Sequence, residues 1–188
     1  MADEKPRIFQ DGRDMTISII VIIIAMVGAV GFTGLCSFNP GRPENGPVQE
    51  VDAKTFMDLE ARAMNFPVRF PQMPQGWVTN SARRSIVAGQ PAPAVGWVTP
   101  QEGYLQLTQT DVEADRAARD FDGNFRDKQR TVDVAGRTAT VYFSDDEKIR
   151  PLWVVDATDV RLLVTGAGED AEFTSLIDET LATAPLPH

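Results

Sequence analysis

The chain has 188 residues, of which 18 are basic and 27 acidic, and its formal net charge is −9. A chain this acidic is repelled by nucleic acid, so we expect no nucleic-acid partner. The only cysteine is Cys36, and the only histidine, His188, is the last residue. These counts exclude an internal disulfide, and the end of a chain is a poor place for a catalytic base or metal ligand.

An almost uninterrupted apolar run without any charge covers residues 17–35. About 20 apolar residues are enough for a helix to cross the hydrocarbon core of a bilayer. The run therefore predicts a single-pass transmembrane helix over residues 15–38, behind a cytoplasmic tail of residues 1–14. Basic residues favour the cytoplasmic side, and those that flank the run are Lys5, Arg7 and Arg13 before it and Arg42 and Lys54 after it.

Two alternatives to an uncleaved anchor stay open at the end of this run. A cleaved signal peptide has a shorter apolar region, of about 7–15 residues, and a small-x-small cleavage site. The exit Gly34-Leu35-Cys36-Ser37-Phe38 lacks such a site. In a lipoprotein, Cys36 would carry the lipid, although Leu35 stands where a small residue is usual. The length of the run favours the uncleaved anchor.

Three glycines, Gly28, Gly31 and Gly34, lie on one slowly rotating stripe of the predicted membrane helix, and Ala25 and Ala29 are four residues apart. Small side chains let helix backbones approach closely in lipid, so this stripe is a candidate face for packing against another membrane protein. The alternative is that glycine is simply common in membrane helices. The candidate packing residues are Ala25, Gly28, Ala29, Gly31 and Gly34.

Residues 39–49 contain three prolines and two glycines and predict an extended linker. The rest of the chain, residues 50–188, is long enough for one domain with its own core and too short for two ordinary ones. We expect this domain to be extracytoplasmic. Its first helix is expected to begin after the capping residue Asp52 and to run to about Met64.

Alternating apolar residues predict three hairpins, 95–99 with 104–110, 132–134 with 138–143, and 152–156 with 160–165, after a further strand at 77–87. Thr110-Asp111-Val112-Glu113 matches a capping box and predicts a short helix to about Phe121. A last amphipathic helix is predicted over Asp170–Ala182. Strands joined by hairpins are antiparallel, so the fold class is α+β, a mainly antiparallel sheet covered by helices.

Two acidic clusters, Asp145-Asp146-Glu147 and Glu169-Asp170 with Glu172, could bind Ca²⁺, but neither has the spacing of an EF-hand loop. Solvated turns and helix starts explain both. Gly166-Ala167-Gly168 lacks the third glycine of a dinucleotide fingerprint and predicts a plain turn. We therefore expect no metal site, no cofactor and no catalytic residue.

Aromatic and basic residues supply the remaining candidates for a binding surface. The three tryptophans lie in strand patterns, which favours core packing, and an exposed one would be a binding anchor. A basic group stands out against the acidic background and predicts either surface ion pairs or a docking patch near the membrane. These residues are Trp77, Trp97 and Trp153, and Arg62, Arg69, Arg83 and Arg84.

The order of elements, with the start Pro74-Gln75-Gly76-Trp77 and a closing amphipathic helix, resembles the Mog1/PsbP-like sandwich. Known members of that fold are mostly binding or assembly modules. The whole layout also resembles an actinobacterial family of membrane-anchored proteins of unknown function, on the span, the linker, Phe70-Pro71 with Gly76-Trp77, and the hairpin containing Gly136. This resemblance implies an envelope location. Some small anchored proteins of such bacteria are accessory subunits of the cytochrome bcc–aa3 respiratory supercomplex.

The favoured function is that of a non-enzymatic accessory or interaction protein. Its partners would be the lipid bilayer and a larger integral membrane complex, with the respiratory supercomplex as one candidate. The alternative is an extracytoplasmic binding module for an envelope lipid or small molecule, which requires an apolar pocket between sheet and helix. A third hypothesis, an enzyme that uses carboxylates alone, requires a cleft with two facing carboxylates.

Overall fold

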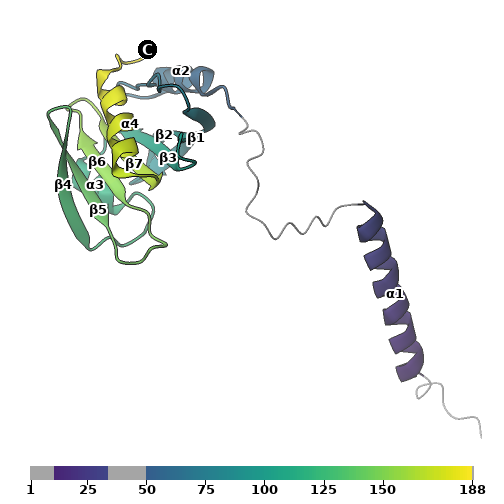
Figure 1. The fold of residues 1–188 in the computed structure, drawn as a ribbon. Helices are drawn as coiled ribbons and strands as arrows, with labels where there is room; N and C mark the ends of the chain where they lie inside the picture. Colours follow the sequence, from purple (N-terminus) through teal and green to yellow (C-terminus); the bar gives the residue numbers. More distant parts are fainter. Residues whose placement is uncertain (1–10, 34–49, 188) are drawn as a thin grey trace, which may run out of the picture. The chain divides into compact units, whose positions relative to one another are not determined.

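The computed structural model describes residues 11–33 and 50–187 of the chain (Figure 1). The chain divides into two compact units, residues 1–46 and residues 47–188. The first unit contains helix α1, Asp11–Thr33, which covers most of the predicted membrane helix. The predicted linker, residues 39–49, lies outside the described residues, as do Gly34, Cys36 and His188.

Helix α1 exposes its large apolar side chains along the part in which side chains are described. Their exposed fractions range from 49% to 67%: Met15, Ile17, Ile19, Ile20, Val21, Ile22, Ile23, Ile24, Met26 and Val27. No helix made of the described residues combines the length and the apolarity that a bilayer span requires.

The second unit is built on a seven-stranded sheet in which every pair of neighbours is antiparallel, in the order β1-β2-β3-β7-β6-β5-β4. This sheet and its helices confirm the α+β class, and the three predicted hairpins form. The strands are β1 Val78–Val87, β2 Gln90–Val98, β3 Tyr104–Thr110, β4 Lys128–Val134, β5 Arg137–Phe143, β6 Leu152–Asp156 and β7 Arg161–Ala167.

A fourth hairpin, between β1 and β2, was not predicted. Its turn is Ala88-Gly89, and both residues have positive φ, as a tight two-residue hairpin requires. The predicted strand begins at Val95, whereas β2 begins five residues earlier, because Pro91 and Pro93 weaken the strand pattern. Both prolines are tolerated because β3 pairs with β2 only along Ala94–Val98, so no ladder bond to β3 is needed at either position.

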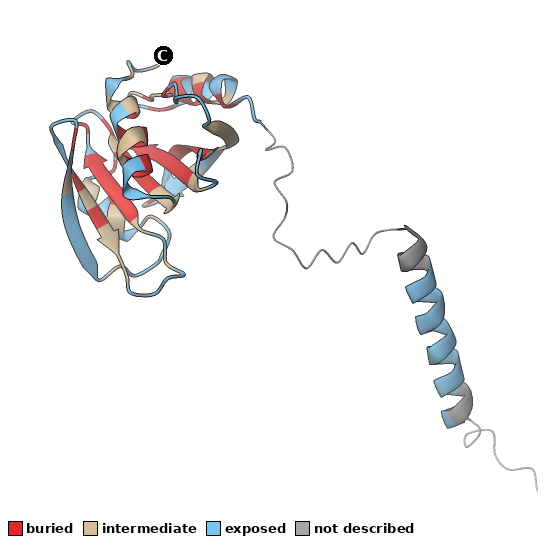
Figure 2. Cartoon of the chain, in the orientation of Figure 1, coloured by how far each residue is buried: buried red, intermediate tan, exposed pale blue. Residues whose placement is uncertain are grey.

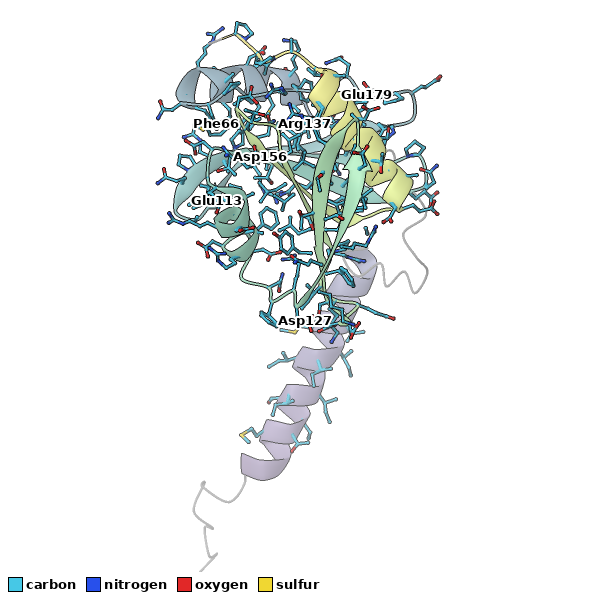
Figure 3. The ribbon with its side chains drawn as sticks, turned by 90° about the vertical axis from the view of Figure 1, so that its left-hand side faces the viewer. Phe66, Glu113, Asp127, Arg137, Asp156 and Glu179 are labelled. Atoms are coloured by element: carbon cyan, nitrogen blue, oxygen red, sulfur yellow. The ribbon has the colours of Figure 1, made fainter. Side chains whose placement is uncertain are left out.

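The helices of this unit lie on both faces of the sheet. Helices α2, Ala53–Ala63, and α4, Asp170–Ala182, pack on one face, and the short helix α3, Ala114–Arg119, packs on the other. In Figure 3, Glu113 at the start of α3 and Glu179 in α4 lie on opposite sides of the sheet. Figure 2 shows burial concentrated in the central strands, whereas the edge strand β4 is mostly exposed.

Two of the three helices in this unit begin where the sequence predicts. Asp52 caps α2 by accepting a hydrogen bond from the Thr55 backbone N–H at 3.1 Å, and α4 has the predicted bounds. The capping box predicted at Thr110 is wrong. Thr110 is fully buried as the last residue of β3, where it pairs with Arg161. The cap is Glu113 instead, whose carboxylate accepts from the backbone N–H groups of the first turn at 3.1 Å.

Candidate functional site

The acidic clusters serve as local turn and helix-start groups. Asp145 forms an ion pair with Lys128 at 2.5 Å, and this hydrogen-bonded partner raises the pKa of Lys128. In the second cluster, Glu172 accepts a hydrogen bond from the Glu169 backbone N–H at 2.9 Å, which closes the capping box of α4. Within the described ranges, no group of three or more potential ligand side chains could hold a metal ion.

The predicted turn at Gly166-Ala167-Gly168 is only partly correct. Gly166 and Ala167 are the last residues of β7, where they pair with Leu105 and Tyr104. A Cβ at Gly166 would lie 2.0 Å from the Tyr104 carbonyl oxygen, so glycine is needed for the close approach of β3 and β7. Gly166 thus serves strand packing.

Two of the three tryptophans belong to the core, as predicted. Trp97 and Trp153 are 2% and 1% exposed. Trp153 stacks on Phe173 of α4 with ring centroids 5.1 Å apart, and the guanidinium of Arg130 lies over its ring at 5.3 Å. Trp77 is only half-buried, and it is therefore the tryptophan that remains a candidate binding anchor.

Three of the four arginines of the basic group have different partners, and Arg62 is exposed in the last turn of α2. Arg84 binds both carboxylate oxygens of the buried Glu60 at 2.8 Å, which raises the pKa of Arg84. Arg69 pairs with Asp159 at 2.7 Å; burial raises the pKa of Asp159, but the bond from Arg69 and neighbouring charges outweigh burial and lower it. Arg83 donates to the side-chain oxygen of Gln106. Ion pairs thus account for two of the four residues.

A hollow of about 530 Å³ lies beside the start of α2 and contains Trp77 in its wall. We call it the aromatic hollow. Phe70 and Trp97 stack there with ring centroids 6.2 Å apart and an interplanar angle of 20°. Its remaining lining comes from residues 50–54, residues 71–73 and Thr79. The hollow thus combines aromatic and thioether surface with a polar rim, which suits a ligand that has both an apolar and a polar part.

Backbone contacts position the walls of the aromatic hollow. The Val51 N–H donates to the Thr79 carbonyl oxygen at 3.0 Å and so ties the start of α2 to β1. Gly76 has a φ of +96° and turns the chain into Trp77, whose N–H donates to the Pro74 carbonyl oxygen at 3.3 Å. The hydrogen bond from Thr55 lowers the pKa of Asp52 at the rim, which keeps a carboxylate beside the opening.

The sequence analysis named several residues of this hollow but did not predict that they lie together. Phe70 was singled out as a mark of a resemblance, and Trp77 and Trp97 as core residues or, if exposed, as binding anchors. Their meeting depends on how the extended segment before β1 folds back over the sheet, and no local pattern encodes that return. The pairing of aromatic residues with Gly76 is the one local signal that could have pointed to it.

Comparison with known proteins gives a family but no function. No curated protein and no solved structure matches this chain. A family model described as "Protein of unknown function (DUF4245)" matches residues 7–180, and so extends through both units. Because this match covers most of the sequence, the chain belongs to the DUF4245 family of proteins of unknown function.

Proposed function

We propose that this protein is a single-pass, membrane-anchored, non-enzymatic interaction protein whose outer domain and helix engage a larger membrane complex. The observation that carries the proposal is the surface of α1. Residues 19–24 are all apolar, and each is at least 49% exposed. At about 3.6 residues per turn, six consecutive positions cover every side of a helix. A helix that is apolar all round is suited to lipid or to the interior of an assembly.

The proposed span draws on the full sequence as well as on α1. Residues 15–41 contain no charged side chain, so the uncharged stretch continues beyond the end of α1 at Thr33. About 20 residues are enough for a span. The basic residues before the stretch favour a cytoplasmic N-terminus, which would place residues 50–188 outside.

The proposed lateral contact uses the small residues of α1. Ala25 and Gly28 lie within the part of α1 whose exposure is described, and a Cβ added at Gly28 would meet nothing within 4 Å. Ala29 and Gly31 belong to the same helix, and Gly34 lies outside the described residues. Small residues of this kind permit close helix packing in lipid. A second helix approaching this side would meet backbone first.

The finer proposals concern the partner and the fold relationship. We propose the cytochrome bcc–aa3 respiratory supercomplex of actinobacteria as the first complex to test, and a Mog1/PsbP-like sandwich as the fold relationship of the outer domain. The order of apolar span, Pro/Gly-rich linker and folded domain in the sequence supports the choice of this complex. The antiparallel sheet with helices on its faces supports the second.

The test is purification of the full-length chain from native membranes in a mild detergent, followed by mass spectrometry. We expect a stoichiometric integral membrane partner with the wild-type chain and its loss with Gly28→Leu. The matched control is Ile22→Leu, which keeps the helix apolar and leaves the small residues intact. Recovery of the wild type without any stoichiometric partner contradicts the proposal, as does equal recovery of a partner with Gly28→Leu.

A second candidate function, a binding module for an envelope lipid or small molecule, is favoured by the aromatic hollow. Support for this function comes from the stacked rings in the wall of the hollow and from its place beside α2, although its accessible lining is more polar than the apolar pocket expected from the sequence. Native mass spectrometry of the full-length protein tests it. We expect a bound lipid in the wild type and its loss in Trp77→Ala, with Leu59→Ala, an exposed position on α2, as the control. Absence of any bound lipid counts against this function.

A further inference from the structure

A second hollow lies on the face of the sheet opposite the aromatic hollow. This is the face that α3 covers only in part. Its volume is about 410 Å³, and its lining includes Tyr104, Gln106, Asn124, Lys148, Arg150 and Thr165. We call it the polar hollow. A neighbouring hollow of about 350 Å³ shares Asn124 and adds the side chains of Phe125 and Tyr142. The sequence indicated neither of these two hollows.

Strand register brings these residues together. Gln106 on β3 pairs with Thr165 on β7, and Thr165 pairs with Leu152 on β6, so these three side chains lie on one face. Leu152 packs in the apolar cluster under α3, which identifies the face. The loops 120–127 and 144–151 flank the same end of the sheet, because Lys128 pairs with Phe143. In Figure 3, Asp127 marks that end of the domain.

The rim of the polar hollow carries cations that lack an acidic partner. Lys148 and Arg150 are exposed, and neither forms an ion pair within the part of the chain that the structure describes. The carboxylate of Asp122, which also lines the hollow, is bound by Arg126 at 2.7 and 2.9 Å. The negative charge of Asp122 is therefore balanced by Arg126. Lys148 and Arg150 remain available to bind an anion, although the domain as a whole is acidic.

The floor of the polar hollow includes neutral hydrogen-bonding groups that are fixed by bonds within the domain. Gln106 is 7% exposed, and its amide is oriented by two bonds, one accepted from Arg83 and one donated to Thr108 at 3.0 Å. The hydroxyl of Tyr104 is hydrogen-bonded to that of Ser81 at 2.9 Å. Groups held in this way are pre-organised to exchange hydrogen bonds with a ligand rich in hydroxyls.

An exposed aromatic ring completes the arrangement. Phe125 is 79% exposed, the largest exposed fraction among the large apolar side chains in the described part of the chain. It follows Asn124 directly and lines the neighbouring hollow. A ligand that covers the ring would gain about 25 cal/mol for each Å² of apolar surface removed from water.

We propose that the polar hollow binds a sugar that carries a carboxylate or a phosphate. Lys148 and Arg150 would bind the anionic group, the floor around Gln106 would bind the hydroxyls, and the ring of Phe125 would cover the apolar face of the sugar. A neutral sugar would leave both cations unused, and an inorganic anion would leave the ring exposed. The inference is independent of the proposed membrane complex, because it uses residues of the outer domain alone.

The test uses the full-length chain in a detergent without a sugar headgroup, because a maltoside would compete for the site. Saturation-transfer NMR is recorded with glucuronic acid, glucose 6-phosphate, glucose and inorganic phosphate as separate probes. We expect saturable binding of at least one anionic sugar, at least tenfold tighter than that of glucose. Tighter binding of glucuronic acid would identify a site for a carboxylate, and tighter binding of glucose 6-phosphate a site for a phosphate. Higher ionic strength should weaken the binding.

Two variants locate the binding. Lys148→Glu with Arg150→Glu should weaken the binding of the anionic sugar at least tenfold, because charge-assisted contacts are replaced by repulsion. The matched control, Arg62→Glu with Arg137→Glu, changes the net charge equally at exposed positions outside both hollows and should leave binding unchanged. Phe125→Ala should reduce the saturation transfer to the sugar ring protons.

Four outcomes overturn the proposal. The first is the absence of saturable binding by either anionic sugar. The second is glucose or inorganic phosphate binding as tightly as the anionic sugars. The third is equal loss of binding in the matched control, and the fourth is undiminished binding in the Lys148 and Arg150 double variant. Near-ultraviolet circular dichroism checks that each variant is folded, and Lys148→Gln with Arg150→Gln repeats the test without charge reversal.

Discussion

The side chain of Gln109 on β3 forms two hydrogen bonds with the backbone of Arg69, accepting from its N–H at 2.8 Å and donating to its carbonyl oxygen at 2.6 Å. Gln109 is fully buried, and its amide takes the place of a neighbouring strand for the extended segment before β1. Leu186 donates to the Val68 carbonyl oxygen at 2.8 Å in the same segment. This segment continues into the wall of the aromatic hollow, so Gln109 links the core to that hollow.

The first prediction is that Gln109→Leu destabilises the domain of residues 50–188. Leucine is similar in size to glutamine but cannot form hydrogen bonds, so the N–H and carbonyl of Arg69 lose their partners. Each buried unsatisfied group lowers the stability by about 1–3 kcal/mol. We expect the free energy of unfolding, measured by urea denaturation, to fall by about 2–4 kcal/mol. Gln90→Leu, at an exposed position in β2, should change it by less than about 0.5 kcal/mol. A loss equal to that of the control would refute the role of Gln109.

The second prediction concerns the close contact at Gly96. A Cβ at this position would lie 2.0 Å from the hydroxyl oxygen of Tyr104 and 2.5 Å from that of Ser81. Gly96→Ala should therefore displace Tyr104 and lower the stability by about 1–3 kcal/mol. Thermal unfolding followed by circular dichroism measures the effect. Tyr104→Ala combined with Gly96→Ala removes the clash with Tyr104, so the double variant should lose less than the sum of the two single losses.

The third prediction concerns Arg84. Its guanidinium forms both hydrogen bonds to the carboxylate of Glu60, whose side chain is 7% exposed. Arg84→Ala leaves that carboxylate buried without a cation, so we expect a lower melting temperature. Adding Glu60→Gln to Arg84→Ala removes the buried charge and should recover part of the loss. The control is Arg62→Ala, a substitution at an exposed position close to Glu60 in the sequence. An unchanged melting temperature in Arg84→Ala would contradict the expectation.

The fourth prediction is a pH dependence at Asp122. Burial raises its pKa, but the hydrogen bonds from Arg126 and Asn124 together outweigh burial and hold the pKa below the ordinary value of 3.8. A carboxyl whose pKa is lower in the folded chain stabilises the fold above the unfolded pKa. That contribution is lost as the pH falls through the folded value. Loop 120–127 should therefore loosen below about pH 4, and the polar hollow with it.

Carboxyl NMR of the wild type measures this titration, and Asp122→Asn removes it. The variant should show a smaller loss of stability than the wild type between about pH 5 and pH 2, because one titrating group is absent. A titration midpoint of Asp122 above its ordinary value would show that burial outweighs Arg126, and the prediction would be wrong.

The parts of the fold that were predicted correctly have local signals. Helix α4 has an acidic capping box at Glu169 and Glu172 and one apolar face, so its bounds follow from the sequence. The turn at Ala135-Gly136 supplies the positive φ values of a tight hairpin. Asp52 caps α2 with the short polar side chain that this position favours.

The parts that were missed depend on contacts between distant residues. Pro91 and Pro93 are compatible with β2 only because β3 ends its pairing at Ala94, which no window of sequence reveals. Thr110 has the pattern of a helix cap, but pairing with β7 keeps it in a strand. The polar hollow joins β3 to the loop containing Lys148 through the strand order β3-β7-β6-β5, so its residues are far apart along the chain.

The central claim is that an uncleaved helix holds the outer domain at the outer face of a membrane. The most direct measurement treats spheroplasts of cells that produce the full chain with external protease, and identifies the N-terminus of the membrane-bound protein by mass spectrometry. We predict a fragment that keeps Met1 or Ala2 and remains in the membrane after an alkaline carbonate wash, with residues 50–188 digested from outside. An N-terminus at a lipidated Cys36, a chain released by the wash, or an outer domain that survives external protease while the spheroplasts stay intact contradicts the account.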